Sequence, residues 1–293
     1  MSRLLIVLAT LAALLLSSPL WLADSNPTDA EFRVVSWNIE NFFDVYDDPY
    51  SRDQVTKPAY VSEGRQKQIA AVLKELNADV VALQEVENRY LLQEFVDTHL
   101  PQMGYQVVLL EGNDSRGIDV ALLTRYPVKE AASYQHRRFE SSSGESMAFR
   151  RDLLRVRLGA PYNGDIYVVH LKSQHGDKVA DVIREAEATE ITKILAEVGG
   201  GSEDYSAMVL GDFNEVPEMP TIGILRDSGL IDPMAGTEKW TYNKEPYLTR
   251  IDFALMTPAR QQGLKSADIL QKMDGHNLEA CSDHYPLLIE WGK

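Results

Sequence analysis

Polar residues that could do chemistry recur where apolar, strand-like segments end. Taken singly, an Asn or Asp at such an end is most often a turn residue, and a lone His in an apolar strand is most often a hydrogen-bonded core residue. A buried charge is costly unless it is paired or bound to a metal, however, so a whole set of them at strand ends indicates a site. The set comprises Asn38, Glu85, His170, Asp212, Asn214, Asp252, Asp283 and His284.

The residue types in this set suit the hydrolysis of a phosphate ester. Asn38, Glu85 and Asp283 offer hard oxygen atoms, which Mg²⁺ and Mn²⁺ prefer to thiolates. The two histidines could donate hydrogen bonds to a phosphoryl oxygen. A histidine-rich zinc site is the weaker alternative, because the chain has no HxH or HExxH spacing. We therefore expect Mg²⁺ or Mn²⁺ as the cofactor.

Spacing predicts two further pairings within the set. Asp252 could orient one of the histidines through a hydrogen bond to its ring. Asp212 and Asn214 lie two residues apart, so their side chains project to the same side if the strand continues. A carboxylate and an amide on one side could together hold a water molecule for attack.

Composition bounds the class of protein. The 293 residues are 44% hydrophobic and 25% charged, which excludes a disordered polymer, a fibrous repeat and a multi-span membrane protein. Lys and Arg number 29 against 44 Asp and Glu, and the net charge of −15 repels polyphosphates. A polyanionic substrate would need a local basic patch or a bound cation. The single cysteine, Cys281, excludes an internal disulfide and a thiolate zinc cluster.

The first residues have the pattern of an export sequence. Leu4–Leu22 carries no charge and follows Arg3, which is typical of a signal peptide. The stretch also approaches the roughly 20 residues that span a bilayer, so an uncleaved anchor is the alternative. We expect residues 1–23 to be a signal peptide or an N-terminal membrane anchor. The protein would then be exported to the periplasm or the extracellular space. If the segment is not cleaved, it would tether the protein to a membrane.

The rest of the chain alternates short apolar runs with few helices, which predicts one α/β domain over residues 32–293 with two mixed sheets packed together. Helical spacing appears around residues 69–76, and a long amphipathic helix over residues 178–198 ends at a run of glycines. The expected strands are VVSW, ADVVALQEV, YQVVLL, IDVALLTR, LLRVRL, IYVVHL, AMVLGDF, RIDFALMT and PLLIEW.

Six segments together resemble the endonuclease/exonuclease/phosphatase family, which includes deoxyribonuclease I, repair exonucleases, inositol polyphosphate phosphatases and neutral sphingomyelinases. They occur in the family's order and cover the chain from Arg33 to Trp291. The resemblance implies a four-layer α/β sandwich: two mixed β-sheets packed face to face with flanking helices. The segments are SWNIENFFD, ALQEVEN, VVHLKSQ, GDFNEVP, RIDFALM and SDHYPL.

The same resemblance implies a role for each member of the set. Glu85, with Asn38 and Asp283 near it, would hold the divalent cation. Asp212 would position or deprotonate the attacking water, and Asn214 would orient it. Asp252 would pair with His284, and His170 would be the second histidine that faces the phosphate. The expected reaction is in-line attack of water on phosphorus, without a covalent intermediate.

The chain departs from the family at one strand. Where the family often has a tyrosine, this chain has Arg116 followed by Gly117, so we expect Arg116 to contact the phosphate. Asp119 is a carboxylate inside the same apolar strand. We hypothesise that it supports catalysis by pairing with His170 and fixing the tautomer of that ring; the alternative is a surface-facing Asp on an alternating strand.

Two further basic residues and one basic cluster are candidates for substrate binding. Arg151 best matches the family's phosphate-contacting arginine, and Lys172 lies two residues beyond His170 on the same side of an extended strand. Residues 136–138, with sequence HRR, form the one dense basic cluster and could receive a nucleic acid, although such runs are usually solvated surface.

The substrate is less determined than the reaction. We expect a nuclease or phosphodiesterase whose partner is a phosphodiester substrate, with nucleic acid as the favoured one, and no obligate protein partner. A sphingomyelinase-like or small-molecule phosphate-ester hydrolase is the alternative, and YNKEPY (Tyr242–Tyr247) could be its membrane-inserting hairpin. A non-catalytic binding module is the third possibility, which the complete set of acidic, amide and histidine residues disfavours.

Overall fold

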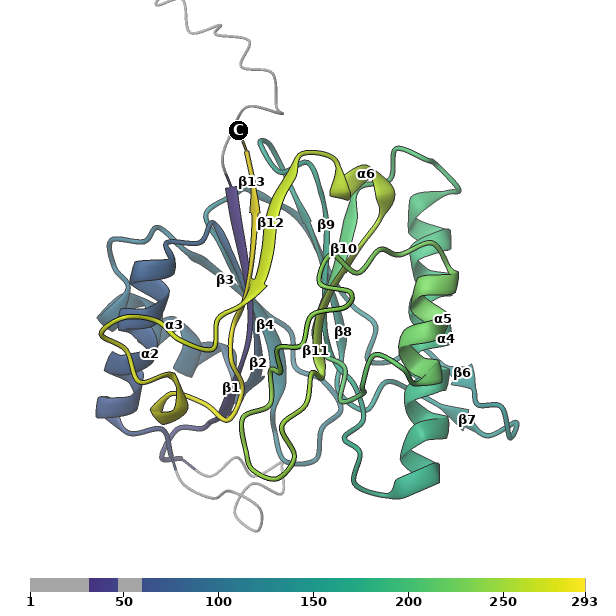
Figure 1. Ribbon diagram of the computed structural model, residues 1–293, viewed down its shortest axis with the longest axis horizontal. Helices are drawn as coiled ribbons and strands as arrows, with labels where there is room; N and C mark the ends of the chain where they lie inside the picture. Colours follow the sequence, from purple (N-terminus) through teal and green to yellow (C-terminus); the bar gives the residue numbers. More distant parts are fainter. Residues whose placement is uncertain (1–31, 47–59, 293) are drawn as a thin grey trace, which may run out of the picture.

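The computed structural model describes residues 32–46 and 60–292, in which two β-sheets face each other and helices cover both outer faces (Figure 1). The expected four-layer α/β sandwich is therefore confirmed. Residues 1–23, for which we expect a signal peptide or anchor, lie outside the described residues. Within the described ranges no helix combines the length and apolar character needed to cross a membrane.

The first sheet consists of β1 (Phe32–Phe42), β2 (Val80–Val86), β3 (Gln106–Leu109), β4 (Asp119–Thr124), β12 (Leu264–Ile269) and β13 (Leu287–Trp291). Their order in space is β12-β13-β1-β2-β4-β3, and the pair β1/β2 is parallel while the other pairs are antiparallel. The outer face is covered by α2 (Glu63–Leu76) and α3 (Arg89–His99) (Figure 1).

The second sheet consists of β5 (Val128–Ser133), β8 (Leu153–Leu158), β9 (Gly164–His170), β10 (Ala207–Asp212) and β11 (Asp252–Met256), in the order β11-β10-β9-β8-β5. Here β9 and β10 are parallel. The long helix α4 (Asp177–Gly199) and α5 (Pro220–Asp227) cover its outer face (Figure 1). The small elements are β6 (Phe139–Glu140), β7 (Ser146–Met147), α6 (Pro258–Gln261) and the 3₁₀ turn η2 (Leu278–Ala280).

Side chains of the central strands alternate between two cores, as the two-residue period of a strand requires. In β9 and β10, Val168 and Leu210 belong to the core between the sheets. Tyr167, Val169 and Val209 belong to a separate core under α4 and α5. Strands buried on both faces explain why the sequence shows continuous apolar runs rather than alternating ones.

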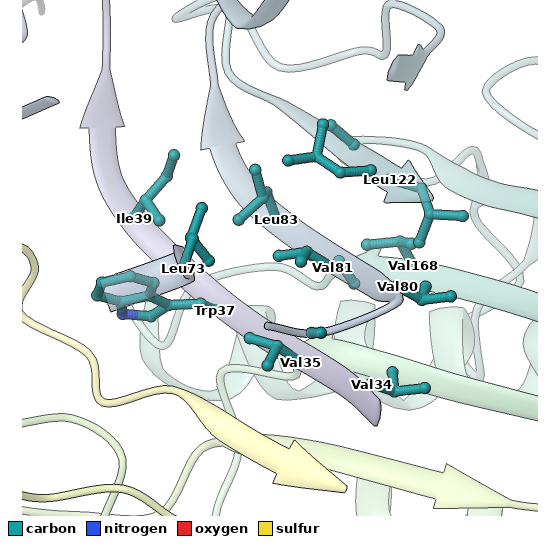
Figure 2. Packing of buried hydrophobic residues seen from close by; sticks show 14 of the residues in the cluster. Val34, Val35, Trp37, Ile39, Leu73, Val80, Val81, Leu83, Leu122 and Val168 are labelled. Atoms are coloured by element: carbon teal, nitrogen blue, oxygen red, sulfur yellow. The ribbon is translucent and has the colours of Figure 1, made fainter. Parts of the chain in front are cut away.

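The core between the sheets continues under α2. Figure 2 shows Trp37 and Ile39 of β1 with Leu73 of α2, and Val168 of the second sheet among residues of the first. All four side chains are at most 1% exposed. Fully burying such a side chain contributes about 1.5–3 kcal/mol, so this core fixes the relative position of the two sheets.

The helix ends follow local sequence signals. The N-cap of α2 is Ser62, whose hydroxyl accepts from Arg65 N–H, and the helix ends at Asn77 in the left-handed region. The expected helix over residues 178–198 is confirmed as α4, and Gly200 caps it with a φ of +58°. A short loop then leads to β10, which pairs with β9 in the second sheet.

Candidate active site

The rows of side chains that face the opposite sheet become polar where β2, β9 and β10 end. These strands end at the lower edge of the sandwich in Figure 1. Two residues beyond Val168 comes His170, and two residues beyond Leu210 comes Asp212, which pairs with it across the parallel strands. A cleft of about 1240 Å³ opens at this edge. Nine of the expected site residues line it: Glu85, Arg116, Arg151, His170, Lys172, Asp212, Asn214, Asp283 and His284.

Glu85 reaches the cleft because β2 is irregular at this residue. Its φ is +64°, and the ladder between β2 and β4 shifts register between Gln84 and Val86. A regular strand would send Gln84 and Glu85 to opposite faces. A non-glycine residue in the left-handed region costs about 1–3 kcal/mol, and such strain is typical of functional sites. The Glu85 carboxylate is held by the N–H of Asn41, 2.8 Å from Oε2.

Asn38 lies at the same edge, but the structure turns its amide nitrogen toward the carboxylates. Its Oδ1 accepts from the N–H of Glu40 at 3.0 Å, which fixes the orientation of the amide. Its Nδ2 donates to Asp212 Oδ2 at 3.1 Å and lies 3.4 Å from Glu85 Oε1. In this geometry Asn38 is a donor that orients two carboxylates, and its expected role as an oxygen ligand of a cation stays a prediction.

The expected pairing of Asp252 with His284 is present. His284 Nδ1 lies 2.7 Å from Asp252 Oδ2, and both side chains are buried. Burial opposes the charged form of His284, but the carboxylates of Asp252, Asp212 and Asp283 outweigh it and raise the pKa of the ring to about 10. His284 is therefore an imidazolium at neutral pH, and its Nε2 lies 3.9 Å from Asp212 Oδ2.

His170 has the opposite electrostatics. Burial lowers the pKa of its ring well below the usual value, and the guanidinium groups of Arg151 and Arg116 lower it further. Its Nδ1 has no hydrogen-bond partner among the described residues. Its Nε2 lies 3.5 Å from Asp212 Oδ2 and 4.0 Å from Glu85 Oε1. A neutral ring in this position carries its proton on Nε2, which faces the carboxylates and the cleft.

Asp212 lies between the two histidines. Burial and the neighbouring carboxylates of Asp252 and Glu85 raise the pKa of Asp212 to about 7, against the opposing effect of His284. The N–H of Asn214 donates to Asp212 Oδ1 at 2.8 Å. A carboxylate whose pKa is near the working pH can accept a proton from water efficiently. Asn214 adopts a φ of +51°, and its Nδ2 donates to Leu171 O at 3.1 Å.

The donor set fits a hard divalent cation beside Glu85 and Asp283. Burial raises the pKa of Asp283 to about 6, and the nearby Glu40 and Glu85 carboxylates add to the effect. A cation would offset the repulsion between these carboxylates and supply the positive charge that buried carboxylates need as a partner. The N–H of Asp283 also donates to Glu40 Oε2 at 3.0 Å, which makes Glu40 a member of the cluster that the sequence did not indicate.

A second group of possible ligands is less suited to a cation. One atom from each of Asp212, Asp252 and His284 lies within 4.8 Å of the others. The Asp252 carboxylate, however, already accepts from His284, and the positive charge of that ring repels a cation. The donor set beside Glu85 and Asp283 therefore suits a cation better than this group does.

The expected substrate-binding cations are present in the cleft, but two of them share one partner. Arg116 Nε lies 3.2 Å from Asp114 Oδ1, and Arg151 Nε lies 2.9 Å from Asp114 Oδ2. Arg151 is buried and also donates to Leu171 O at 2.7 Å. Lys172 Nζ donates to backbone and side-chain oxygens of the loop that follows β9. These cations thus hold the cleft walls and lend positive potential to it.

The hypothesis that Asp119 pairs with His170 is wrong. Asp119 begins β4 and its Oδ1 accepts from the N–H of Gly112 at 2.7 Å, while His170 Nδ1 has no partner among the described residues. Asp119 is 5% exposed, so the surface-facing alternative fails as well. Burial raises the pKa of Asp119 to about 8, and the Glu111, Asp152 and Asp114 carboxylates contribute. Its role is to secure the loop that carries Gly112.

Asp119→Asn should make the protein more stable at pH 8 but not at pH 4. The folded protein keeps the Asp119 proton up to about pH 8, whereas an unfolded aspartate releases it near pH 3.9. The free energy of unfolding of the wild-type protein therefore falls as pH rises between these values, by an amount on the order of a few kcal/mol. Asp119→Asn has no proton to release here, so the variant avoids this loss. Urea unfolding of both proteins at pH 4, 6 and 8 measures this, and a difference that stays constant with pH contradicts it.

A buried carboxylate that the sequence did not indicate supports the cleft from α4. Glu187 is 1% exposed, and its Oε1 accepts from the N–H of Arg150 at 2.7 Å while its Oε2 accepts from the N–H of Lys172 at 3.0 Å. Arg184 donates to Lys172 O at 3.1 Å from the same helix. In the sequence, Glu187 is only a polar residue on the otherwise apolar face of a predicted helix. No local pattern indicates that it binds the N–H groups of Arg150 and Lys172.

Glu187→Gln should destabilise the protein and raise KM more than it lowers kcat. The amide nitrogen that replaces one oxygen cannot accept a hydrogen bond, so one backbone N–H is left buried without a partner, at a cost of about 1–3 kcal/mol. Thermal unfolding should show a Tm lower by about 2–4 °C per kcal/mol. Glu185→Gln on the same helix is the matched control, and equal Tm values for the two variants would refute the role.

Comparisons with known proteins agree with this architecture. The model of the Endonuclease/Exonuclease/phosphatase family matches residues 33–228. No match was found among curated proteins. Solved structures similar to this chain include a mannosyl-6-phosphatase from Bacteroides thetaiotaomicron, which is 19% identical with a TM-score of 0.65 over 88% of this chain and 98% of that one.

Two further structures have the same fold. The beta toxin from Staphylococcus aureus is 17% identical with a TM-score of 0.63, over 89% of this chain and 100% of that one. TDP2 from D. rerio, solved with a single strand DNA product, is 17% identical with a TM-score of 0.59, over 90% and 100%. The likeness to these structures shows the fold, and the family model matches well over half of the sequence. This chain therefore belongs to the endonuclease/exonuclease/phosphatase family of phosphoric ester hydrolases.

Proposed function

We propose that this protein is a divalent-metal-dependent phosphodiesterase that hydrolyses phosphodiester bonds of nucleic acid. One observation carries the proposal: a carboxylate with a pKa of about 7, Asp212, lies between a neutral histidine and a charged one, 3.5 Å from His170 and 3.9 Å from His284. A base near its pKa with hydrogen-bond donors on both sides is the arrangement that attack of water on phosphorus requires.

Each residue has a defined task in this reaction. Asp212 accepts a proton from the attacking water, whose oxygen forms a bond to phosphorus as the bond to the leaving oxygen breaks on the opposite side. Asn214 orients that water through its amide. His284, kept charged by Asp252, donates from Nε2 to a phosphoryl oxygen, and His170 donates from its own Nε2.

Glu85 and Asp283 would hold the cation, and Asn38 keeps the carboxylates of Glu85 and Asp212 in place. When bound, Mg²⁺ or Mn²⁺ supplies Lewis-acid stabilisation of the charge on the phosphoryl oxygens. The charged His284 ring and the Asp212 carboxylate act in a buried site, where such interactions are stronger than in water.

The size and charges of the cleft favour a diester over a small monoester. Its volume of about 1240 Å³ exceeds what one sugar phosphate fills. A monoester dianion is best held by a free arginine fork, but Arg116 and Arg151 are both committed to Asp114. Tyr247, 71% exposed at the rim of the cleft, offers a ring on which a base could stack.

The test compares substrates at equal metal concentration. Purified protein with Mn²⁺ should hydrolyse bis(4-nitrophenyl) phosphate with a kcat/KM well above that for 4-nitrophenyl phosphate, and EDTA should abolish both activities. Preference for the monoester, or turnover of sphingomyelin without turnover of DNA, would instead support the small-molecule or lipid alternative. In that case the Tyr242–Tyr247 segment becomes the candidate membrane contact.

We further propose that the protein is exported, since residues 4–22 carry no charge and follow Arg3. Fractionation of cells with N-terminal sequencing tests this. A shortened chain outside the cytoplasm supports a signal peptide, a full chain in the membrane supports an anchor, and a full chain in the cytosol contradicts export.

A further inference from the structure

A second hollow, of about 310 Å³, lies next to the active-site cleft. The two share Asn113 and Arg150 in their walls, so they are adjacent. The hollow lies between the loop before β4, the segment before β6 and the strand β7. Its lining includes Asn113, His136, Arg138, Ser146, Met147 and Arg150.

The charge of this hollow is opposite to that of the molecule. The chain carries a net charge of −15, yet none of the residues that line the hollow is acidic. Arg138 and Arg150 are exposed and make no ion pair within residues 32–46 and 60–292. Their neighbour Arg137 differs, because it pairs with Glu190 at 2.8 Å and Glu197 at 2.6 Å. Within the basic cluster at residues 136–138, Arg137 is therefore structural, whereas His136 and Arg138 line the hollow together with Arg150.

The walls are held in place before any ligand binds. Asn113 Nδ2 donates to Gln135 O at 2.6 Å and to Phe149 O at 3.0 Å, which joins three segments. The ion pairs of Arg137 fasten the segment before β6 to α4, and Glu187 accepts from the N–H of Arg150. A preformed site binds an anion without the cost of ordering its loops.

We propose that this hollow binds a backbone phosphate of the polynucleotide that flanks the scissile one, through Arg138, Arg150 and His136. The inference rests on the proposed function and extends it, because it makes a polymer with repeated phosphates the substrate. Contacts of this kind fix the register of a nucleic acid without reading its sequence. They also explain how a chain of net charge −15 can attract a polyanion: the attraction is local and lies beside the catalytic residues.

Arg138→Glu tests the proposal against a matched charge reversal, Lys129→Glu. Lys129 is exposed near the start of β5. This part of β5 pairs with the last residues of β8, at the opposite end of that strand from Arg150. The substrates are a 12-nucleotide single-stranded DNA and the 4-nitrophenyl ester of thymidine 5′-monophosphate, which has one phosphate. For Arg138→Glu, the ratio of the two kcat/KM values should fall about tenfold, as expected for one lost charge-assisted contact. Lys129→Glu should leave the ratio unchanged.

Salt dependence separates a lost phosphate contact from a damaged fold. The slope of log Kd against log salt, measured by fluorescence anisotropy of the 12-mer in EDTA, should become shallower by about 0.7 in Arg138→Glu. Equal losses on both substrates, or an unchanged slope, would overturn the proposal. The binding measurement needs no turnover, so it tests the hollow even if the wild-type protein hydrolyses neither diester. Such a lack of hydrolysis would refute the proposed function and not the binding of phosphate by the hollow.

Discussion

Replacing His284 with alanine should lower kcat for phosphodiester hydrolysis by about 10³-fold, the loss expected when a preorganised donor to a developing oxyanion is removed. The ring is charged at neutral pH because Asp252, which accepts from its Nδ1 at 2.7 Å, together with Asp212 and Asp283 outweighs the effect of burial and raises the pKa of the ring to about 10. KM should change little, because the interaction strengthens mainly in the transition state. Steady-state kinetics with bis(4-nitrophenyl) phosphate and Mn²⁺ measure the effect.

The Asp252–His284 pair should behave as one unit. Asp252→Asn alone should cost about 10²-fold in kcat, and adding it to His284→Ala should cost almost nothing more, since the carboxylate acts through the ring. Additive losses in the double variant would show that Asp252 acts independently, for instance as a metal ligand. His276→Ala provides a control histidine, because this residue pairs with Glu75 away from the cleft.

Glu85→Gln should have the largest effect on metal binding. Replacing an anionic oxygen ligand with an amide should weaken Mn²⁺ binding by at least about 100-fold, since changes in the outer shell of a metal site already cost about 10–100-fold. Glu85 accepts from one backbone N–H, that of Asn41, and the single oxygen of an amide can still accept it, so the variant should keep its fold. Calorimetric titration with Mn²⁺ and the metal concentration for half-maximal activity both report the change.

Glu94→Gln on the exposed face of α3 is the control for that measurement. It removes the same charge from the molecule but not from the cleft. If both variants bind Mn²⁺ like the wild-type protein, the cation does not bind at Glu85, and the group formed by Asp212, Asp252 and His284 becomes the candidate.

Much of the fold and the site could be predicted from the sequence, because apolar strands that end in polar residues are a local pattern. Val168 with His170 and Leu210 with Asp212 show it plainly: the same row of a strand is apolar inside the sandwich and polar at the edge. The pairing of Asp252 with His284 could also be predicted, since both residues lie in recognisable segments.

Other features depend on contacts that sequence patterns do not encode. Asp119 lies in the expected strand, but its partner is the N–H of Gly112, and only the path of the intervening loop decides that. Arg116 and Arg151 meet at Asp114 for the same reason. The donor role of Asn38 follows from the N–H of Glu40, a residue with a φ of +46°. Non-local pairings of this kind require the three-dimensional structure.

Some elements escaped prediction although their signals were present. Helix α3 begins after Asn88, whose side chain caps it by accepting from Leu91 N–H, and Leu92, Phe95 and Val96 form its buried face. β12 is an edge strand with partly exposed residues, so its alternation is weak. Both lie at the periphery, and neither carries a residue of the site.

Nicking of supercoiled plasmid DNA by the purified protein, with Mg²⁺, with Mn²⁺ and with EDTA, beside His284→Ala, tests whether the protein hydrolyses nucleic acid. We predict nicking that requires both the cation and His284. Intact plasmid under all conditions, from a protein that is folded and binds Mn²⁺, would contradict hydrolysis of nucleic acid and leave a lipid or small-molecule phosphate ester as the substrate.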